Sequence, residues 1–131
     1  MPEKTDAVRA IGEAFGADAV DAALALLHPD VELLPIRARL EGNAFRGHQG
    51  YRELLSLFEQ DWEELRLSQD RIEQVGERVL ATGRITAMGR TSGVPLDMPL
   101  AVLYDFRDGL IVRMESFADL DEARSAARDN R

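Results

Sequence analysis

The stretch that decides the fold is Pro99–Ala127, PLAVLYDFRDGLIVRMESFADLDEARSAA, near the end of the chain. Within it, Asp108-Gly109 is the two-residue signal of a tight turn between antiparallel strands. Further on, Asp119 and Glu122 have the spacing of a capping box, which marks the start of a helix. The stretch therefore predicts a β-hairpin that leads directly into a helix.

Counting outward from the turn predicts four cross-strand pairs, so eight side chains share one face. The pairs are Phe106 with Ile111, Tyr104 with Arg113, Val102 with Glu115, and Leu100 with Phe117. This face is apolar and aromatic, with two charges embedded in it, and the opposite face is also largely apolar. A sheet that is apolar on both sides, with ionic groups on the aromatic side, predicts a lined cavity.

The chain has 131 residues, which predicts one domain over residues 1–131 with a single core. Hydrophobic residues make up 45% and charged residues 31%, the composition of a globular protein. The net charge of −8 argues against nucleic acid and anionic membranes as partners, since both need a basic patch. No apolar run approaches a membrane span and no signal-peptide pattern opens the chain, so we expect a cytoplasmic protein.

Cofactor chemistry is not indicated by the residue types. The sequence has no cysteine, which excludes disulfides, thiolate catalysis and thiolate metal sites. His28 and His48 are the only histidines and belong to no spaced set of ligands, whereas a catalytic metal usually takes three protein ligands. There is also no phosphate-binding glycine loop. We therefore expect neither a metal nor another cofactor.

The rest of the chain predicts helix, helix, strand, helix and two strands. The expected elements are a helix from Thr5 to Gly16, a helix from Asp18 that stops before Pro29, a strand over Val31–Leu34, a loop over Pro35–Gly47, a long helix with an apolar face from Tyr51 to Leu65, and strands over Leu67–Val75 and Val79–Met88. This order predicts an α+β protein with helices packed on one face of an antiparallel sheet. A strongly curved sheet of this kind leaves a cone, whose concave side would hold the pocket.

Two segments carry a family resemblance: GNAFRGHQGYRELL over Gly42–Leu55 and YDFRDGLIVRMESFADLDEA over Tyr104–Ala123. They resemble the SnoaL-like, polyketide cyclase-like branch of the nuclear-transport-factor-2-like superfamily, and the resemblance extends over nearly the whole chain. It implies a cone-shaped, cystatin-like fold in which helices close the concave face of a curved antiparallel sheet. It also implies a homodimer paired through the outer sheet face, for which the surface around Leu103, Val112 and Met114 is suited.

The resemblance does not fix one activity, because the same scaffold serves isomerases, cyclases, hydrolases and noncatalytic modules. The positions that match the ketosteroid isomerase triad are Leu34, Ala10 and Val102, and none of these can move a proton. The epoxide hydrolases of this fold use an Asp-Arg-Asp arrangement, and of these three groups this chain has Arg84 and at most one carboxylate, Glu115. Resemblance to the polyketide cyclases implies a simpler site, in which a single acidic residue in the pocket acts as general acid or base. Glu115 fits that role.

Two hypotheses follow. In the first, the protein is a cofactor-independent isomerase, cyclase or hydrolase: Glu115 exchanges a proton with a small hydrophobic carbonyl compound, while Arg84, Arg113 and Tyr104 hold the developing oxyanion. In the second, it is a noncatalytic ligand-binding or dimerisation module, and Arg113 and Glu115 form a structural ion pair. The expected ligand-binding wall comprises Trp62, Phe58, Val102, Phe106, Phe117 and Leu34. A bulge would exchange Glu115 for Ser116 at the pocket face and move Arg84 outside.

Overall fold

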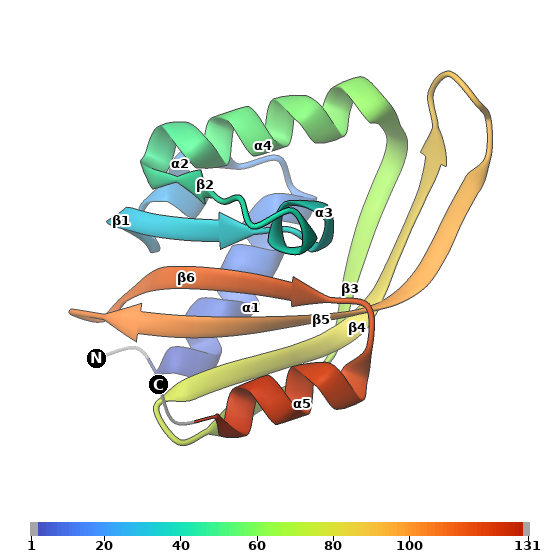
Figure 1. The fold of residues 1–131 in the computed structure, drawn as a ribbon. Coiled ribbons are helices and arrows are strands. Elements are labelled where there is room, and N and C mark those ends of the chain that lie inside the picture. The colour runs from blue at the N-terminus through green and yellow to red at the C-terminus, as the bar shows by residue number, and fades with distance from the viewer. Residues whose placement is uncertain (1–2, 130–131) are drawn as a thin grey trace.

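The computed structural model describes residues 3–129, which form one curved six-stranded sheet with helices on both faces (Figure 1). The helices are α1 (Lys4–Gly16), α2 (Val20–Leu24), α3 (Ile36–Leu40), α4 (Gly47–Asp61) and α5 (Leu120–Arg128). The strands are β1 (Leu27–Leu34), β2 (Phe45–Arg46), β3 (Trp62–Val75), β4 (Arg78–Gly89), β5 (Pro95–Arg107) and β6 (Leu110–Phe117). None of these helices has the length and apolar character needed to span a bilayer.

The α+β class and the curved sheet are confirmed, but the sheet is mixed and not purely antiparallel. Its strand order is β2-β1-β6-β5-β4-β3, and β1 runs parallel to β6 while every other neighbouring pair is antiparallel. The first long strand therefore lies beside the last one. The far ends of β4 and β5 bend toward the C-terminal end of α4, which gives the sheet its concave side (Figure 1).

The turn between β5 and β6 lies at Asp108-Gly109, as predicted. Both residues have positive φ, 55° and 80°, which is the backbone conformation that the tightest hairpin turns require. The first predicted pair, Phe106 with Ile111, also forms. The turn signal in the sequence therefore located the hairpin correctly.

Beyond that first pair, the predicted register is wrong by one residue. The pairing shifts because β6 carries one extra residue, Val112, as a bulge. A bulge sets two residues of one strand opposite one residue of the other, so the side chains that follow it change faces. Tyr104 consequently lies opposite Met114 and not Arg113, and Glu115 projects from the other face of the sheet.

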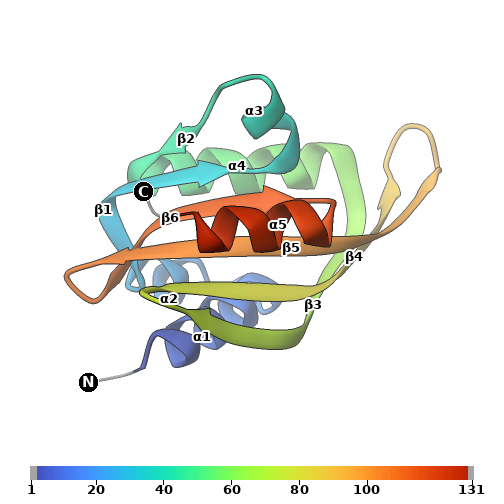
Figure 2. The same cartoon turned by 60° about the horizontal axis from the view of Figure 1, so that its bottom comes forward.

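The helices occupy both faces of the sheet, which corrects the expectation of a single helical layer. Figure 2 shows α1, α2 and α4 behind the sheet and α5 in front of it. On the concave side, the main core packs α1, α2 and α4 against the sheet around Val8, Leu24 and Tyr51. On the outer side, Ala123 and Ala127 of α5 pack in a smaller core against the outer face of β4, β5 and β6.

Three local predictions are also corrected. The long helix ends at Asp61, so Trp62 and Leu65 belong to β3, because pairing with β4 along its whole length takes these residues into the sheet. The second helix ends at Leu24, and β1 already begins at Leu27. The expected loop between Pro35 and Gly47 contains the short helix α3 and the short strand β2.

Candidate functional site

The concave side of the sheet encloses a cavity of about 640 Å³. Its wall is mostly apolar. It is formed by helices α1, α3 and α4, by strands β3, β4, β5 and β6, and by the end of β1. Representative wall residues are Ile11, Leu33, Leu55, Phe58, Leu100 and Val102. A cavity of this size and lining is typical of sites that enclose small apolar molecules.

The wall follows from the alternation of side chains along the strands. On β5, residues Leu96, Met98, Leu100, Val102 and Tyr104 are two apart, and all of them line the cavity. The residues between them project from the outer face, where Leu103 packs beneath α5. From α1 and α4, Phe15 and Phe58 meet edge to face with their ring centroids 6.2 Å apart, and both rings line the cavity.

Polar groups gather at the buried end of the cavity. Tyr51 of α4 and Tyr104 of β5 are only 4% and 3% exposed, and both line the cavity. Gln69 of β3 lies with them: its amide nitrogen donates to the Val8 carbonyl oxygen at 3.1 Å, and its side chain hydrogen-bonds the Tyr104 hydroxyl. Tyr51 lies close to Tyr104, and we call the three residues the tyrosine cluster (Tyr51, Gln69 and Tyr104).

Both phenols of the tyrosine cluster are held in the protonated form. Burial raises the pKa of Tyr104 well above its usual range, and this outweighs the hydrogen bond from Gln69, which acts in the opposite direction. Burial also raises the pKa of Tyr51, and the nearby charge of Asp18 raises it further. Both residues therefore offer neutral hydroxyl groups to anything in the cavity.

Other wall residues reach solvent. Leu67 of β3 is 37% exposed, and the two charged residues of the wall, Glu13 of α1 and Arg37 of α3, are exposed as well. Arg37 forms an ion pair with Glu41 one helical turn further on, with 3.6 Å between Nε and Oε2. Among residues 3–129, no group of three or more His, Asp or Glu side chains is arranged to hold a metal ion.

The structure brings half of the expected ligand-binding wall to the cavity. Leu34, Phe58 and Val102 line it. Trp62 and Phe106 are partly buried but stand outside the lining, and Phe117 packs on the outer face beneath α5. Phe117 is displaced by the bulge in β6, and Trp62 by its position in β3.

Of the four residues expected to act together in catalysis, only Tyr104 lines the cavity. Arg84 projects from the outer face of β4 and forms a 2.8 Å ion pair with Asp97 of β5. Arg113 and Glu115 also lie on the outer face, with 3.9 Å between Arg113 Nη2 and Glu115 Oε1. The predicted proton-transfer group and its two arginines are therefore separated from Tyr104 by the sheet.

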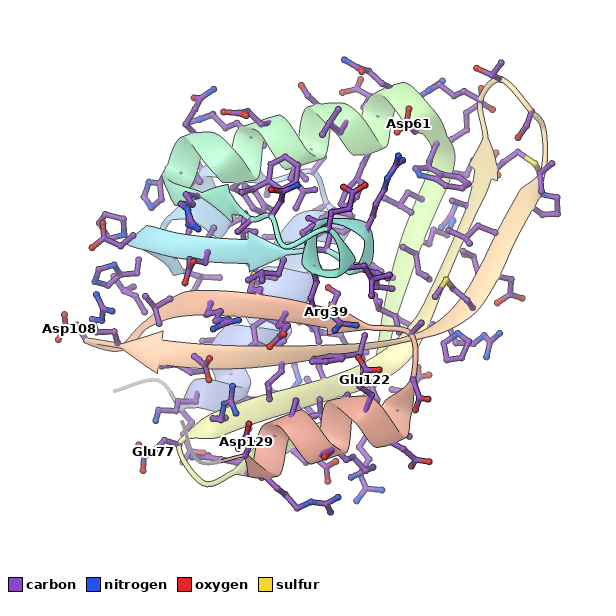
Figure 3. The ribbon with its side chains drawn as sticks, in the orientation of Figure 1. Arg39, Asp61, Glu77, Asp108, Glu122 and Asp129 are labelled. Atoms are coloured by element: carbon purple, nitrogen blue, oxygen red, sulfur yellow. The ribbon has the colours of Figure 1, made fainter. Side chains whose placement is uncertain are left out.

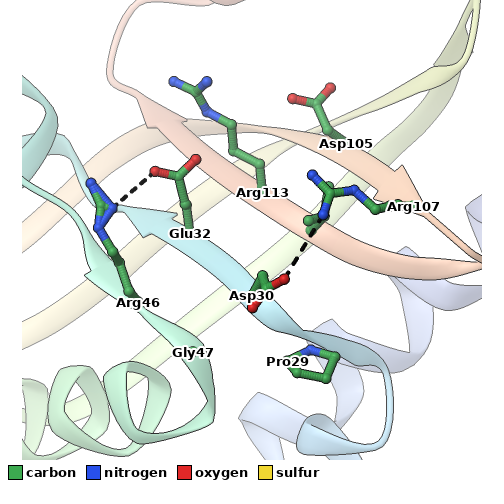
Figure 4. Close-up of a pocket in the computed structure, with 9 residues that line it drawn as sticks. Pro29, Asp30, Glu32, Arg46, Gly47, Asp105, Arg107 and Arg113 are labelled. Carbon is green, nitrogen blue, oxygen red and sulfur yellow. Dashed lines mark hydrogen bonds and ion pairs between the residues drawn. The ribbon is translucent and has the colours of Figure 1, made fainter.

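The outer face carries a charged groove over β1, β2 and β6 (Figure 4). Its acidic and basic side chains are equal in number: Asp30, Glu32 and Asp105 against Arg46, Arg107 and Arg113. Two ion pairs form within it, Arg46 with Glu32 at 3.2 Å and Arg107 with Asp30 at 3.9 Å. The buried Nε of Arg113 has no hydrogen-bond partner within the part of the chain that the structure describes.

Glu115 is 7% exposed, and its Oε1 also lacks a hydrogen-bond partner among residues 3–129. It lies near Arg39, whose guanidinium stacks 4.4 Å from the Phe117 ring centroid and donates to the Ser116 carbonyl oxygen. Figure 3 shows Arg39 reaching across β6 toward Glu122 of α5, with which it forms a 2.8 Å ion pair. This arrangement ties α3 and α5 to the outer face and is remote from the cavity.

Sequence reasoning missed Tyr51 and Gln69 as cavity residues. The sequence places Tyr51 on the buried face of a helix, which is correct but does not distinguish core from cavity wall. Gln69 faces the cavity together with the apolar residues of β3, and the register of β3 shifts just after it. A glutamine in an otherwise apolar row of alternate residues, Leu65 and Leu67 before it, is the signal that would have identified it.

The sequence matches the model of the SnoaL-like domain over residues 8–114. This match covers most of the chain, so the protein belongs to the SnoaL-like family. Comparison with curated proteins gives no match. The family assignment therefore defines the scaffold, and it leaves the activity open.

Solved structures of similar fold align over almost the whole chain. An NTF2-like protein of unknown function from Burkholderia pseudomallei is 23% identical with a TM-score of 0.79, covering 98% of this chain and 100% of that one. A protein proposed to be a polyketide cyclase, from Xanthomonas campestris, is 24% identical with a TM-score of 0.76, covering 94% and 95%. TerC, co-crystallised with polyporic acid, is 24% identical with a TM-score of 0.74, covering 94% and 96%. These likenesses confirm the NTF2-like fold.

Proposed function

We propose that this protein binds a small, largely apolar molecule in the cavity between the sheet and helices α1, α3 and α4. The observation that carries this proposal is the cavity itself, about 640 Å³ of space with an almost continuous apolar wall. Apolar surface left in contact with water is unfavourable by roughly 25 cal/mol per Å², so a matching ligand gains affinity by covering it. The co-crystallisation of the similarly folded TerC with polyporic acid supports a ligand-binding use of this scaffold.

Binding is better supported than catalysis. The carboxylate proposed as the proton acceptor, Glu115, lies on the outer face, and Arg84 and Arg113 lie there with it. The carboxylate that lines the cavity, Glu13, is exposed to solvent. An isomerase, cyclase or hydrolase would therefore have to work with the buried Tyr104 hydroxyl and a solvent-exposed carboxylate.

The test is equilibrium dialysis of the protein against 2-ethylnaphthalene, an apolar probe without hydrogen-bonding groups. We expect saturable binding of one molecule per chain. Val102→Trp fills the cavity from β5, and we expect it to weaken binding at least about tenfold, since the apolar space it occupies is no longer available to the probe. Circular dichroism checks that the variant remains folded.

Two controls make this test specific. Leu57→Trp adds the same side chain at an exposed position of α4 outside the cavity lining, and we expect it to leave probe affinity unchanged. Glu115→Gln on the outer face should also leave affinity unchanged. Absence of saturable binding to the wild-type protein, or equal loss of affinity in Val102→Trp and Leu57→Trp, would refute the proposal.

We further propose that two copies pair through the outer face of β1, β2 and β6. This part of the outer face is not covered by α5, and it carries equal numbers of acidic and basic side chains, which two copies related by a two-fold axis could pair with one another. The pairing surface expected around Leu103, Val112 and Met114 is revised. Leu103 lies beneath α5 and Met114 lines the cavity, so of these three residues only Val112 lies in the groove.

A cytoplasmic location stays a prediction from the sequence.

A further inference from the structure

The tyrosine cluster gives the cavity a polar end. We propose that Tyr104 and Gln69 form a specificity-determining subsite there, which selects apolar ligands that carry an uncharged, hydrogen-bond-accepting oxygen at their buried end. This inference rests on the proposed function, since it concerns the orientation and chemical class of the ligand in the same cavity. Three features of the structure support it. They are a notch in α1, left by the missing side chain of Gly12, the hydrogen bonds of Gln69, and the distribution of charged residues in the cavity wall.

The notch is made by Gly12 in the middle of α1. A Cβ atom added at Gly12 would lie 2.5 Å from both Cδ and Oε1 of Gln69, and 2.8 Å from its Nε2. Glycine inside a helix is destabilising relative to alanine, so its presence here calls for a local reason. The missing side chain allows the Gln69 amide to lie directly against the helix, at the edge of the cavity.

Gln69 is held in this notch by a hydrogen bond and in turn orients Tyr104. Its amide nitrogen donates to the Val8 carbonyl oxygen at 3.1 Å, one turn before Gly12. An amide has a second N–H, and the contact with Tyr104 lowers the pKa of that phenol, as a bond donated to the phenol oxygen would. The Tyr104 O–H remains available to donate toward the cavity.

The charge distribution indicates that the accepted group is uncharged. The buried residues of the lining are all neutral, whereas its two charged residues, Glu13 and Arg37, are exposed to solvent, Arg37 by 91%. A carboxylate or phosphate at the buried end would lose its hydration without gaining a counter-charge. A ketone or similar neutral oxygen can instead accept the Tyr104 hydrogen bond without burying charge.

The test compares two probes of nearly equal shape, 2-acetylnaphthalene and 2-ethylnaphthalene. The first has a carbonyl group where the second has a methylene group. Equilibrium dialysis gives the affinity of each for the wild-type protein and for Tyr104→Phe, which keeps the ring and removes the hydroxyl. We expect the wild-type protein to prefer the ketone by about tenfold, the effect of one buried hydrogen bond, and Tyr104→Phe to bind the two probes equally. Tyr51→Phe should retain the preference.

Gln69→Leu and Gly12→Ala test the positioning role. Both should reduce the preference to less than about threefold, because the Tyr104 hydroxyl loses the contact that orients it. Gln74→Leu is the matched control, since Gln74 is an exposed glutamine of the same strand that bonds only the Gly76 carbonyl oxygen. A ratio of two affinities is insensitive to a general loss of stability, so it separates positioning from a merely structural effect.

The outcomes distinguish this inference from the proposed function. Equal wild-type affinities for the ketone and the hydrocarbon would overturn the inference and leave the apolar cavity as a binding site. A preference that survives Tyr104→Phe, or one that is lost in Tyr51→Phe instead, would also overturn it. Binding of neither probe would refute both the inference and the proposed function.

Discussion

At the scale of single residues, Tyr51 and Tyr104 are the chain's two tyrosines, and burial acts on both of them. Burial raises the pKa of Tyr104, so the folded protein keeps this phenol protonated at a pH where the unfolded chain releases the proton. The unfolded phenol ionises near pH 10. The stabilisation is therefore fully present below that pH and is lost as pH rises above it.

This linkage predicts a specific alkaline instability. Between pH 9 and pH 11, the free energy of unfolding of the wild-type protein should fall by about 1 kcal/mol more than that of Tyr104→Phe. Urea titrations followed by circular dichroism at both pH values measure the difference. Lys4 and Tyr51 are present in both proteins, so their contributions cancel in the comparison. Equal alkaline losses in the two proteins would mean that Tyr104 is accessible to solvent.

At the scale of the elements, α5 begins at a defined N-terminal cap. The Asp119 carboxylate accepts hydrogen bonds from the backbone N–H groups of Asp121 and Glu122, at 2.8 and 3.2 Å. Asp119→Ala removes this cap, and we expect a loss of about 1 kcal/mol in the free energy of unfolding. Chemical denaturation measures it, with Ser125→Ala on the exposed side of α5 as the control. If Asp119→Ala leaves the free energy of unfolding unchanged, packing alone positions the helix.

Much of this element structure could be predicted from the sequence, because local signals determine it. The turn at Asp108-Gly109 and the cap at Asp119 each depend on a sequence signal of two to four neighbouring residues, and both predictions are correct. The bulge at Val112 gave no such signal, since valine is also an ordinary strand residue. The register after the bulge decides which face Glu115 and Phe117 occupy, so the error at this one position misplaced both of them.

At the scale of the whole molecule, the charged groove predicts self-association. We expect the wild-type protein to sediment as a dimer at high concentration and to dissociate on dilution. Arg113→Ala should weaken the dimer, because it removes one of the three basic side chains of the groove and leaves an acidic side chain unmatched. Analytical ultracentrifugation measures both, and Arg66→Ala, an exposed arginine of β3, is the control. A wild-type protein that remains a monomer at every concentration would rule out this pairing.

The parallel pairing of β1 with β6 has a consequence for the order in which the protein is completed. Besides the two-residue β2, the neighbour of β1 in the sheet is Leu110–Phe117, the last of the sheet's six strands in chain order. Contacts between segments so far apart in the chain must wait until both exist, and they close a long loop when they form. During translation, β1 therefore keeps one unpaired edge until Leu110–Phe117 has also left the ribosome.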